Sequence, residues 1–150
     1  MFKSFMAEAL KQAKQALKSG EVPIGAVVID QHGDIIAQDH NRVIALNDPT
    51  AHAEILVIRK ACQLVRCERL INCSLYVTIE PCPMCASAIS QARIAKLYFG
   101  ADDKKSGGVE NGPLIFYQSS CHWKPEVYGG IMETEAKHLM KSFFAGKRSS

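Results

Sequence analysis

The chain has 150 residues, of which 47% are hydrophobic and 22% charged, and its formal net charge is +3. A chain of this length and apolar content can bury a full core, so we expect residues 1–150 to form a single domain and exclude a disordered chain. No stretch approaches the roughly 20 apolar residues of a membrane-spanning helix. No hydrophobic signal region is recognisable either, so we expect a cytoplasmic protein without a membrane anchor.

The first elements form a helix and a hairpin. Apolar residues recur at helical spacing over residues 2–17, and Gly20 is expected to end this helix. The branched residues of 24–29 predict a buried strand, and a turn at 31–34 leads into a second strand at 34–38. The two strands therefore predict a hairpin.

Helices and strands then alternate. The loop 41–50 ends in residues typical of a helix start, and Pro83 stands where a first-turn proline costs no hydrogen bond. The expected order is a helix at 51–64, a strand at 74–79, a helix at 82–92, a strand at 95–99, a loop at 101–112, an irregular stretch with Cys121-His122-Trp123, and a helix at 131–144. This order predicts an α/β layered domain whose sheet mixes parallel and antiparallel strands.

Two short motifs point to a metal. His52-Ala53-Glu54 stands at one predicted helix start, and Pro81-Cys82-Pro83-Met84-Cys85 stands at the next. A helix N-terminus favours the thiolate form of cysteine, which is the form that binds zinc. One histidine and one cysteine pair make three ligands, and no second Cys-x-x-Cys or His-x-x-x-His completes the set. Three protein ligands leave one position for water, which is the catalytic arrangement of zinc.

Glu54 is the candidate base for that water. Two thiolates neutralise the charge of the zinc ion, so the water needs a nearby group to take its proton. On one helix, His52 and Glu54 diverge by roughly 200° and converge only if the helix N-terminus points at the metal. A thioredoxin-like redox pair is the alternative for Cys82 and Cys85, but it leaves Pro81 and the His-x-Glu motif unexplained.

The joint pattern His-x-Glu and Pro-Cys-x-x-Cys is the signature of zinc deaminases that act on nucleobases. Over nearly its whole length the chain resembles the bacterial tRNA-specific adenosine deaminases. The matching blocks are residues 21–26, 47–55, 75–85, 99–101 and the pair Phe143-Phe144. The metal motif is common to deaminases of many bases. The flanking blocks restrict the resemblance to the deaminases that act on adenosine in tRNA.

This resemblance implies a cytidine-deaminase-like fold, a three-layer α/β/α sandwich with a mixed five-stranded sheet. It implies a homodimer with one Zn²⁺ per subunit. It also implies hydrolysis of adenosine to inosine at the wobble position (34) of an arginine tRNA anticodon, with the anticodon stem-loop as partner and water attacking C6 of the base.

The resemblance also assigns roles to residues of this chain. His52, Cys82 and Cys85 match the zinc ligands, and Glu54 matches the proton shuttle. The residues expected at the substrate are Asn41 for the flipped base, backbone groups near Ala53 and Pro81 for the amine and water, Asp103 and Lys105 for the RNA backbone, and Phe144 and Arg148 for the anticodon loop. The loop 102–108 departs from the family pattern, so its RNA contacts are expected to differ.

Two other functions share these motifs. A guanine or cytosine deaminase acting on free bases has the same metal site, and a zinc-stabilised RNA-binding module has no catalysis. The aromatic and basic residues Phe143, Phe144, Lys147 and Arg148 favour an RNA substrate. The remaining cysteines, Cys62, Cys67, Cys73 and Cys121, are interpreted as packing residues, as is the Cys121-His122 pair.

Overall fold

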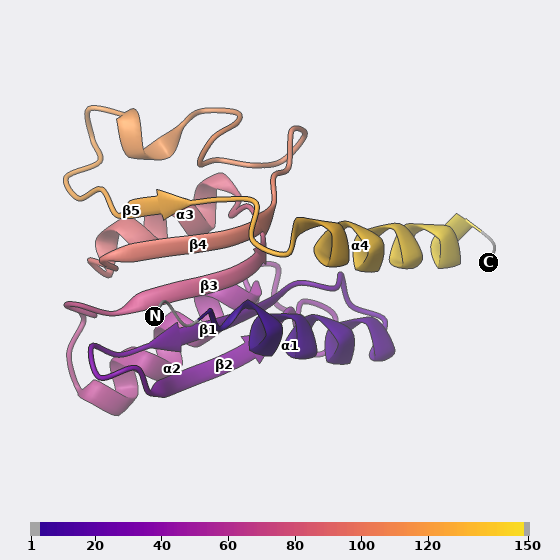
Figure 1. Ribbon diagram of the computed structural model, residues 1–150, viewed down its shortest axis with the longest axis horizontal. Coiled ribbons are helices and arrows are strands. Elements are labelled where there is room, and N and C mark those ends of the chain that lie inside the picture. The colour runs from indigo at the N-terminus through magenta and orange to yellow at the C-terminus, as the bar shows by residue number, and fades with distance from the viewer. Residues whose placement is uncertain (1–3, 149–150) are drawn as a thin grey trace.

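The structure is a computed structural model that describes residues 4–148, with the side chain of Arg148 outside the description. Its elements are α1 (Met6–Lys18), β1 (Gly25–Ile29), β2 (Ile35–His40), α2 (Ala53–Val65), β3 (Ser74–Ile79), α3 (Pro83–Gln91), β4 (Lys96–Ala101), the short 3₁₀ helix η1 (Ile115–Tyr117), β5 (Glu126–Tyr128) and α4 (Glu133–Arg148). Figure 1 shows their arrangement.

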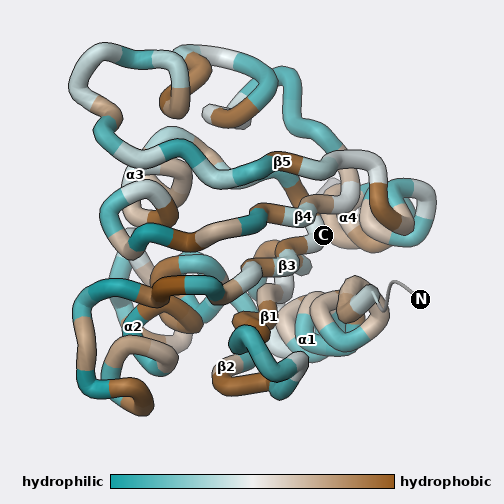
Figure 2. The backbone as a smooth tube through the Cα atoms, turned by 60° about the vertical axis from the view of Figure 1, so that its left-hand side comes forward, coloured by the Kyte–Doolittle hydropathy of each residue, from teal (hydrophilic) through white to brown (hydrophobic). Residues whose placement is uncertain are grey.

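The five strands form one mixed sheet in the order β2-β1-β3-β4-β5. The β1 strand pairs antiparallel with both β2 and β3, whereas β3, β4 and β5 run parallel to one another. Figure 2 shows α2 and α3 on one face of the sheet and α1 and α4 on the other. This is the three-layer α/β/α sandwich with a mixed five-stranded sheet that the resemblance implies.

Each face of the sheet carries its own apolar core. Val28, Leu75 and Val77 belong to the cluster that packs against α2 and α3, whereas Val27 and Tyr76 belong to the cluster under α1 and α4. Neighbouring residues of one strand point to opposite faces. Because both faces are covered, the inner strands β1, β3 and β4 are buried except at Ser74 and Lys96, the first residues of β3 and β4, which explains their runs of apolar residues.

The parallel strands β3 and β4 bring the segments that follow them together. The β3 and β4 strands end at the same edge of the sheet, so the segment after Ile79 and the loop after Ala101 are neighbours (Figure 1). Open α/β sheets bind their ligands outside this carboxyl edge of the strands. The edge is therefore where a functional site is expected.

The predicted helices and strands are confirmed, with shifts of a few residues at their ends. Gly20 lies just after α1 with a positive φ of 77°, as a glycine that ends a helix does. The prediction missed β5, because its three residues are largely exposed and offer no apolar run. It also ended the last helix at residue 144, whereas α4 continues to Arg148. Phe2 lies outside the described residues.

No helix among the described residues has both the length and the apolar character needed to cross a bilayer. This finding agrees with the absence of a long apolar stretch in the sequence.

Asp39 joins β2 to α2 through a buried carboxylate. Its side chain is 2% exposed and accepts hydrogen bonds from Lys60 Nζ at 2.7 Å, Arg42 Nε at 2.7 Å and the backbone N–H of His40 at 2.8 Å. Burial acts to raise the pKa of Asp39, but the bonds from Lys60, His40 and Arg42 outweigh it and lower the pKa below its usual value. The ionised form is therefore the one that stabilises the fold.

We predict that Asp39→Asn lowers the free energy of unfolding at pH 7 by about 1–2 kcal/mol, a modest loss because water screens the half-exposed Lys60 and Arg42. Since the folded pKa is depressed, the stabilisation is complete above the unfolded value of about 3.9 and is lost as the pH falls through the folded pKa. Urea unfolding of both proteins across this pH range measures the difference between their free energies of unfolding. Asp34→Asn on the exposed turn is the control, and a gap that persists undiminished at the lowest pH contradicts the prediction.

Candidate active site

Three metal-binding side chains meet at the carboxyl edge of the sheet. His52 and Cys82 are the N-cap residues of α2 and α3, and Cys85 lies one turn into α3. His52 Nδ1 is 3.6 Å from Cys82 Sγ and 3.5 Å from Cys85 Sγ. The donor atoms of the three residues all lie within 4.8 Å of one another, and among the described residues this is the one cluster of its kind.

The donor set suits zinc. Both helix N-termini face the cluster, so their backbone dipoles favour negative charge on the sulfur atoms. The neighbouring Cys85 thiol and the His52 ring lower the pKa of Cys82 to about 4, whereas hydrogen bonding to Cys82 and burial raise the pKa of Cys85. The surroundings of Cys82 therefore favour its thiolate, the form that binds zinc. A neutral imidazole and two cysteine sulfurs are the ligands of many zinc sites.

Glu54 lies beside this cluster in the first turn of α2. Its side chain is 3% exposed, and its Oε1 atom has no hydrogen-bond partner among the described residues. Burial raises the pKa of Glu54 to about 7. A buried polar atom without a partner is rare in proteins and indicates a place for a ligand, water or ion. The His-x-Glu motif thus places one acid group next to the candidate metal centre.

A cavity of about 500 Å³ opens above these residues. His52, Glu54 and Cys82 line it from the metal side. The other walls come from four segments: residues 20–24 between α1 and β1, the loop after β2 with Asn41, Val43 and Ile44, the loop after β4 with Asp103 and Ser106, and α4 with Phe143 and Lys147. The candidate metal centre therefore has a cavity in front of it that is large enough to admit a nucleobase.

Asn41 and Ala53, both expected at the substrate, are bonded to each other. Asn41 is 5% exposed, and its Oδ1 accepts a hydrogen bond from the Ala53 backbone N–H at 2.8 Å. This bond satisfies one of the free N–H groups at the start of α2. The Ala53 N–H therefore already has a hydrogen-bond acceptor, whereas the amide N–H₂ of Asn41 remains as a donor on the cavity wall.

Of the basic and aromatic residues that the sequence predicts at the RNA, some line the cavity and others lie on the surface beside it. Phe143 and Lys147 line the cavity, whereas Phe144 is 47% exposed and packs edge-on against Phe143 with ring centroids 5.3 Å apart. Lys105 is exposed on the loop after β4. The side chain of Arg148 lies outside the described residues, although its backbone belongs to α4.

Sequence reasoning missed the buried acid groups that support the cavity walls. Glu21 is 2% exposed, and its carboxylate accepts hydrogen bonds from the backbone N–H groups of Ile44 and Ala45. Glu80, directly before the Pro81-Cys82 motif, supports the opposite wall in the same way. An acid group inside or beside an apolar strand is the sequence signal that could have revealed both.

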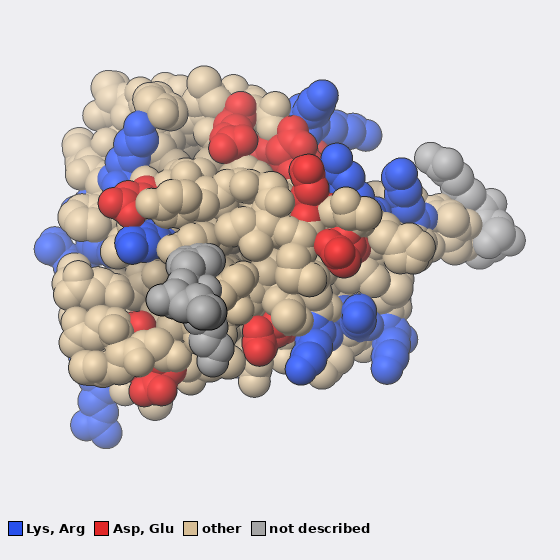
Figure 3. Space-filling view, in the orientation of Figure 1, with Lys and Arg blue, Asp and Glu red and all other residues tan. Residues whose placement is uncertain are grey.

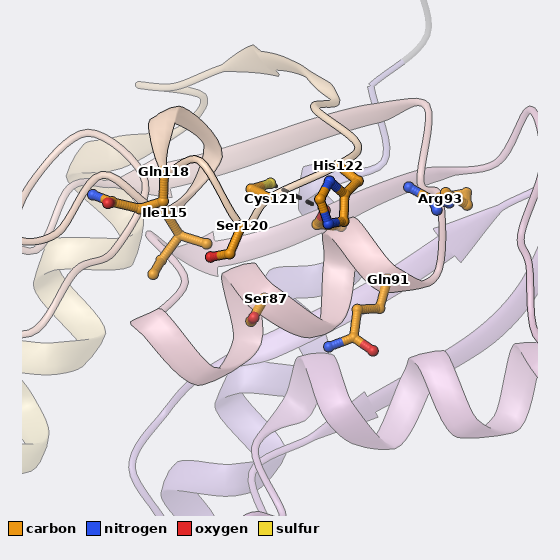
Figure 4. Close-up of a pocket in the computed structure, with 9 residues that line it drawn as sticks. Ser87, Gln91, Arg93, Ile115, Gln118, Ser120, Cys121 and His122 are labelled. Atoms are coloured by element: carbon orange, nitrogen blue, oxygen red, sulfur yellow. Dashed lines mark hydrogen bonds between the residues drawn. The ribbon is translucent and has the colours of Figure 1, made fainter.

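Cys121 and His122 lie at a second, polar cavity of about 440 Å³ between α3 and the loop 113–123 (Figure 4). Cys121 Sγ is 3.2 Å from Ser90 Oγ and donates to the Trp123 carbonyl at 3.1 Å. Cys121 also packs against the apolar core under α2 and α3. The packing interpretation of Cys121 therefore agrees with its contacts, whereas that of Cys67 is wrong, because Cys67 is exposed after the end of α2.

Comparison with known proteins shows the class to which the chain belongs. Residues 2–101 match the family model described as the cytidine and deoxycytidylate deaminase zinc-binding region. A solved guanine deaminase from Nitrosomonas europaea shares the fold with a TM-score of 0.76 at 22% identity, over 93% of this chain and 82% of its own. The chain is thus a member of the zinc-binding deaminases.

Relatives with higher sequence identity define the family more specifically. A tRNA-specific adenosine deaminase of Agrobacterium fabrum is 52% identical over 96% of this chain and 94% of its own length. That of Aquifex aeolicus is 42% identical over 97% and 95%. A structure solved in a study of A-to-I editing by tRNA:A34 deaminases has a TM-score of 0.88 at 52% identity, over 90% of this chain and 97% of its own. The chain belongs to the family of tRNA-specific adenosine deaminases.

We predict that His52→Ala and Cys82→Ser each abolish stoichiometric zinc binding, because two remaining donors hold the ion poorly. Metal content of the purified proteins, measured by plasma mass spectrometry, checks this. Cys121→Ser is the matched control and keeps its zinc. A full equivalent of zinc in either ligand variant contradicts the assignment of the metal centre.

Proposed function

We propose that the protein hydrolyses adenosine to inosine and ammonia at the wobble position of a tRNA anticodon. The observation that carries the proposal is the buried Glu54 carboxyl group, with its unpartnered Oε1, beside a three-donor His/Cys/Cys cluster at a cavity of about 500 Å³. The names of relatives at 42–52% identity support the same substrate.

His52, Cys82 and Cys85 hold the zinc ion in this proposal. When bound there, zinc acts as a Lewis acid that makes a water molecule nucleophilic near neutral pH. A site with three protein donors leaves room for that chemistry, whereas a structural zinc site uses four.

Glu54 moves the protons. Its carboxylate takes a proton from the attacking water and passes it to N1 of the purine as oxygen adds to C6. It then carries the remaining proton of the new C6 hydroxyl group to the departing amine, and the C6–N bond breaks to leave a C6 carbonyl group and ammonia. Adenosine and one water thus give inosine and ammonia, with one carboxyl group acting as base and then as acid.

The cavity walls support a flipped nucleobase. The Oδ1 atom of Asn41 is bonded to Ala53, so Asn41 offers its amide N–H₂ to an acceptor atom on the base. Val43, Ile44 and Phe143 give the cavity apolar walls. A base in an anticodon loop is already unpaired, so its entry costs only modest unstacking.

The surroundings of the cavity favour RNA over a free base. Lys147 Nζ lies 5.4 Å from the centre of the Phe143 ring, so a cation and an aromatic face stand together at the wall. Exposed Phe144 offers a further ring for stacking. Figure 3 shows basic side chains above and below on the right-hand side of the molecule, with acidic side chains between them. Unpaired bases stack on aromatic side chains, and phosphates pair with basic ones. Lys105, Asp103 and Arg148 are further proposed RNA contacts.

Guanine deamination is the second candidate. A guanine deaminase of Bacillus subtilis is 31% identical over 97% of this chain and 92% of its own, with a TM-score of 0.63. Ammonia release from guanine, cytosine and a wobble-adenosine stem-loop, measured side by side, distinguishes the substrates. Zinc-loaded protein that binds the stem-loop but releases no ammonia would support the non-catalytic RNA-binding module instead.

The arginine tRNA and the homodimer are proposed on the resemblance alone, and the cytoplasmic location stays the expectation from the sequence. Inosine formation across a set of tRNAs and sedimentation of the zinc-loaded protein test the first two.

We predict that Glu54→Gln keeps zinc and fold but lowers the rate of inosine formation by roughly 10²–10⁴-fold, because an amide cannot relay protons. The substrate is an anticodon stem-loop with adenosine at the wobble position, and single-turnover rates together with zinc content provide the measurement. Glu68→Gln, an exposed acid after α2, is the control. A Glu54→Gln protein as fast as the parent would remove Glu54 from the reaction.

A further inference from the structure

Glu80 stands at the junction between the sheet and the candidate metal centre. It follows the last residue of β3 and precedes Pro81 and Cys82, and its side chain is 3% exposed. Its own backbone N–H donates to the Ala101 carbonyl at the end of β4, at 2.8 Å. The main chain of Glu80 is therefore tied to both parallel strands.

The Glu80 carboxylate gathers N–H groups from the whole loop that follows β4. Oε1 accepts from the Asp103 backbone at 2.9 Å and from Asn111 Nδ2 at 2.7 Å. Oε2 accepts from the backbone N–H groups of Val109 at 3.0 Å, Glu110 at 2.9 Å and Asn111 at 3.1 Å. All of these partners are donors. A carboxylate can accept from all of them, whereas a carboxamide has a single accepting oxygen and brings two N–H groups of its own.

The loop also packs directly on the metal-binding segment. The Gly108 backbone N–H donates to the Pro81 carbonyl at 2.8 Å, and a Cβ atom on Gly108 would stand 2.6 Å from Pro83 N. A Cβ on Gly107 would collide with the Glu80 carboxylate itself. The two glycines therefore allow a backbone approach that no other residue permits.

The loop held in this way forms part of the cavity wall. Asp103 and Ser106 line the same cavity as His52 and Glu54, and Glu80 itself lies in the wall between the metal-binding segment and this loop. The Asp103 side chain stabilises the turn in between, since its Oδ1 accepts from the backbone N–H groups of Lys105 at 3.1 Å and Ser106 at 2.9 Å. A chain of hydrogen bonds thus runs from Glu80 through Asp103 to Ser106.

We infer that Glu80 is a positioning residue for the substrate: its buried carboxylate, whose hydrogen-bond partners all lie on the loop 102–111, holds this loop in the conformation that completes the cavity wall next to the metal centre. This inference rests on the proposed function for the identity of the substrate. Glu80 acts on substrate binding through Asp103 and the loop, so its loss affects KM more than kcat.

The test is Glu80→Gln, with Glu110→Gln as the control, because Glu110 lies on the same loop but its side chain is exposed. For the wobble-adenosine stem-loop we expect KM to rise at least about tenfold, equivalent to about 1.4 kcal/mol, while kcat stays within about threefold and zinc remains stoichiometric. Hydrogen exchange should accelerate in residues 102–111 and stay unchanged in the opposite wall, residues 42–47. Glu110→Gln should match the parent protein.

Gly108→Ala provides a second variant if Glu80→Gln fails to fold. It leaves Glu80 in place but pushes the loop away from Pro83, so the same rise in KM and the same local exchange are expected. An unchanged KM in a folded Glu80→Gln protein, or loss of zinc with a fall in kcat, overturns the inference. If the parent protein makes no inosine from the stem-loop, the proposed function fails, and exchange and zinc content still decide whether Glu80 holds the loop.

Discussion

The convergence of two helix N-termini at the carboxyl edge of β3 and β4 is the constraint on which the site depends. His52 and Cys82 are 30 residues apart in sequence, yet as N-cap residues of α2 and α3 they bring their donor atoms together with Cys85. The same geometry turns Glu54, in the first turn of α2, toward the cluster. Because helix N-termini favour anions, the fold itself stabilises the thiolates that zinc requires.

Buried carboxylates give the irregular loops around the cavity a defined shape. Glu21 and Glu80 accept backbone N–H groups that have no partner in a helix or strand, one on each side of the cavity. Burial of a charged group carries a large desolvation cost unless the group is hydrogen-bonded. Glu21 accepts from two backbone N–H groups, and Glu80 accepts from four and from the side chain of Asn111. The walls of the cavity are thus positioned by the same kind of interaction, although they belong to loops that are far apart in sequence.

The chemistry of the site was largely predictable from the sequence, because His52, Glu54, Cys82 and Cys85 lie in two compact motifs whose helix starts are marked by local residues. The helices and the inner strands were predictable from their apolar patterns. The β5 strand was not, since its pairing with β4 depends on tertiary contacts and not on a pattern of its own. The choice of Phe143 over Phe144 as a wall residue likewise depends on how α4 is rotated against the sheet, which the adjacent pair of rings does not reveal.

We expect the site to hold a zinc ion with an incomplete set of protein ligands next to Glu54. Zinc K-edge X-ray absorption of the purified protein tests it most directly, because sulfur at about 2.3 Å and nitrogen or oxygen at about 2.0 Å give separate distances. We expect two sulfur donors and two lighter donors, with the same sulfur count in Cys121→Ser. A third sulfur donor, or protein purified without zinc that cannot be loaded with it, would rule out this metal centre.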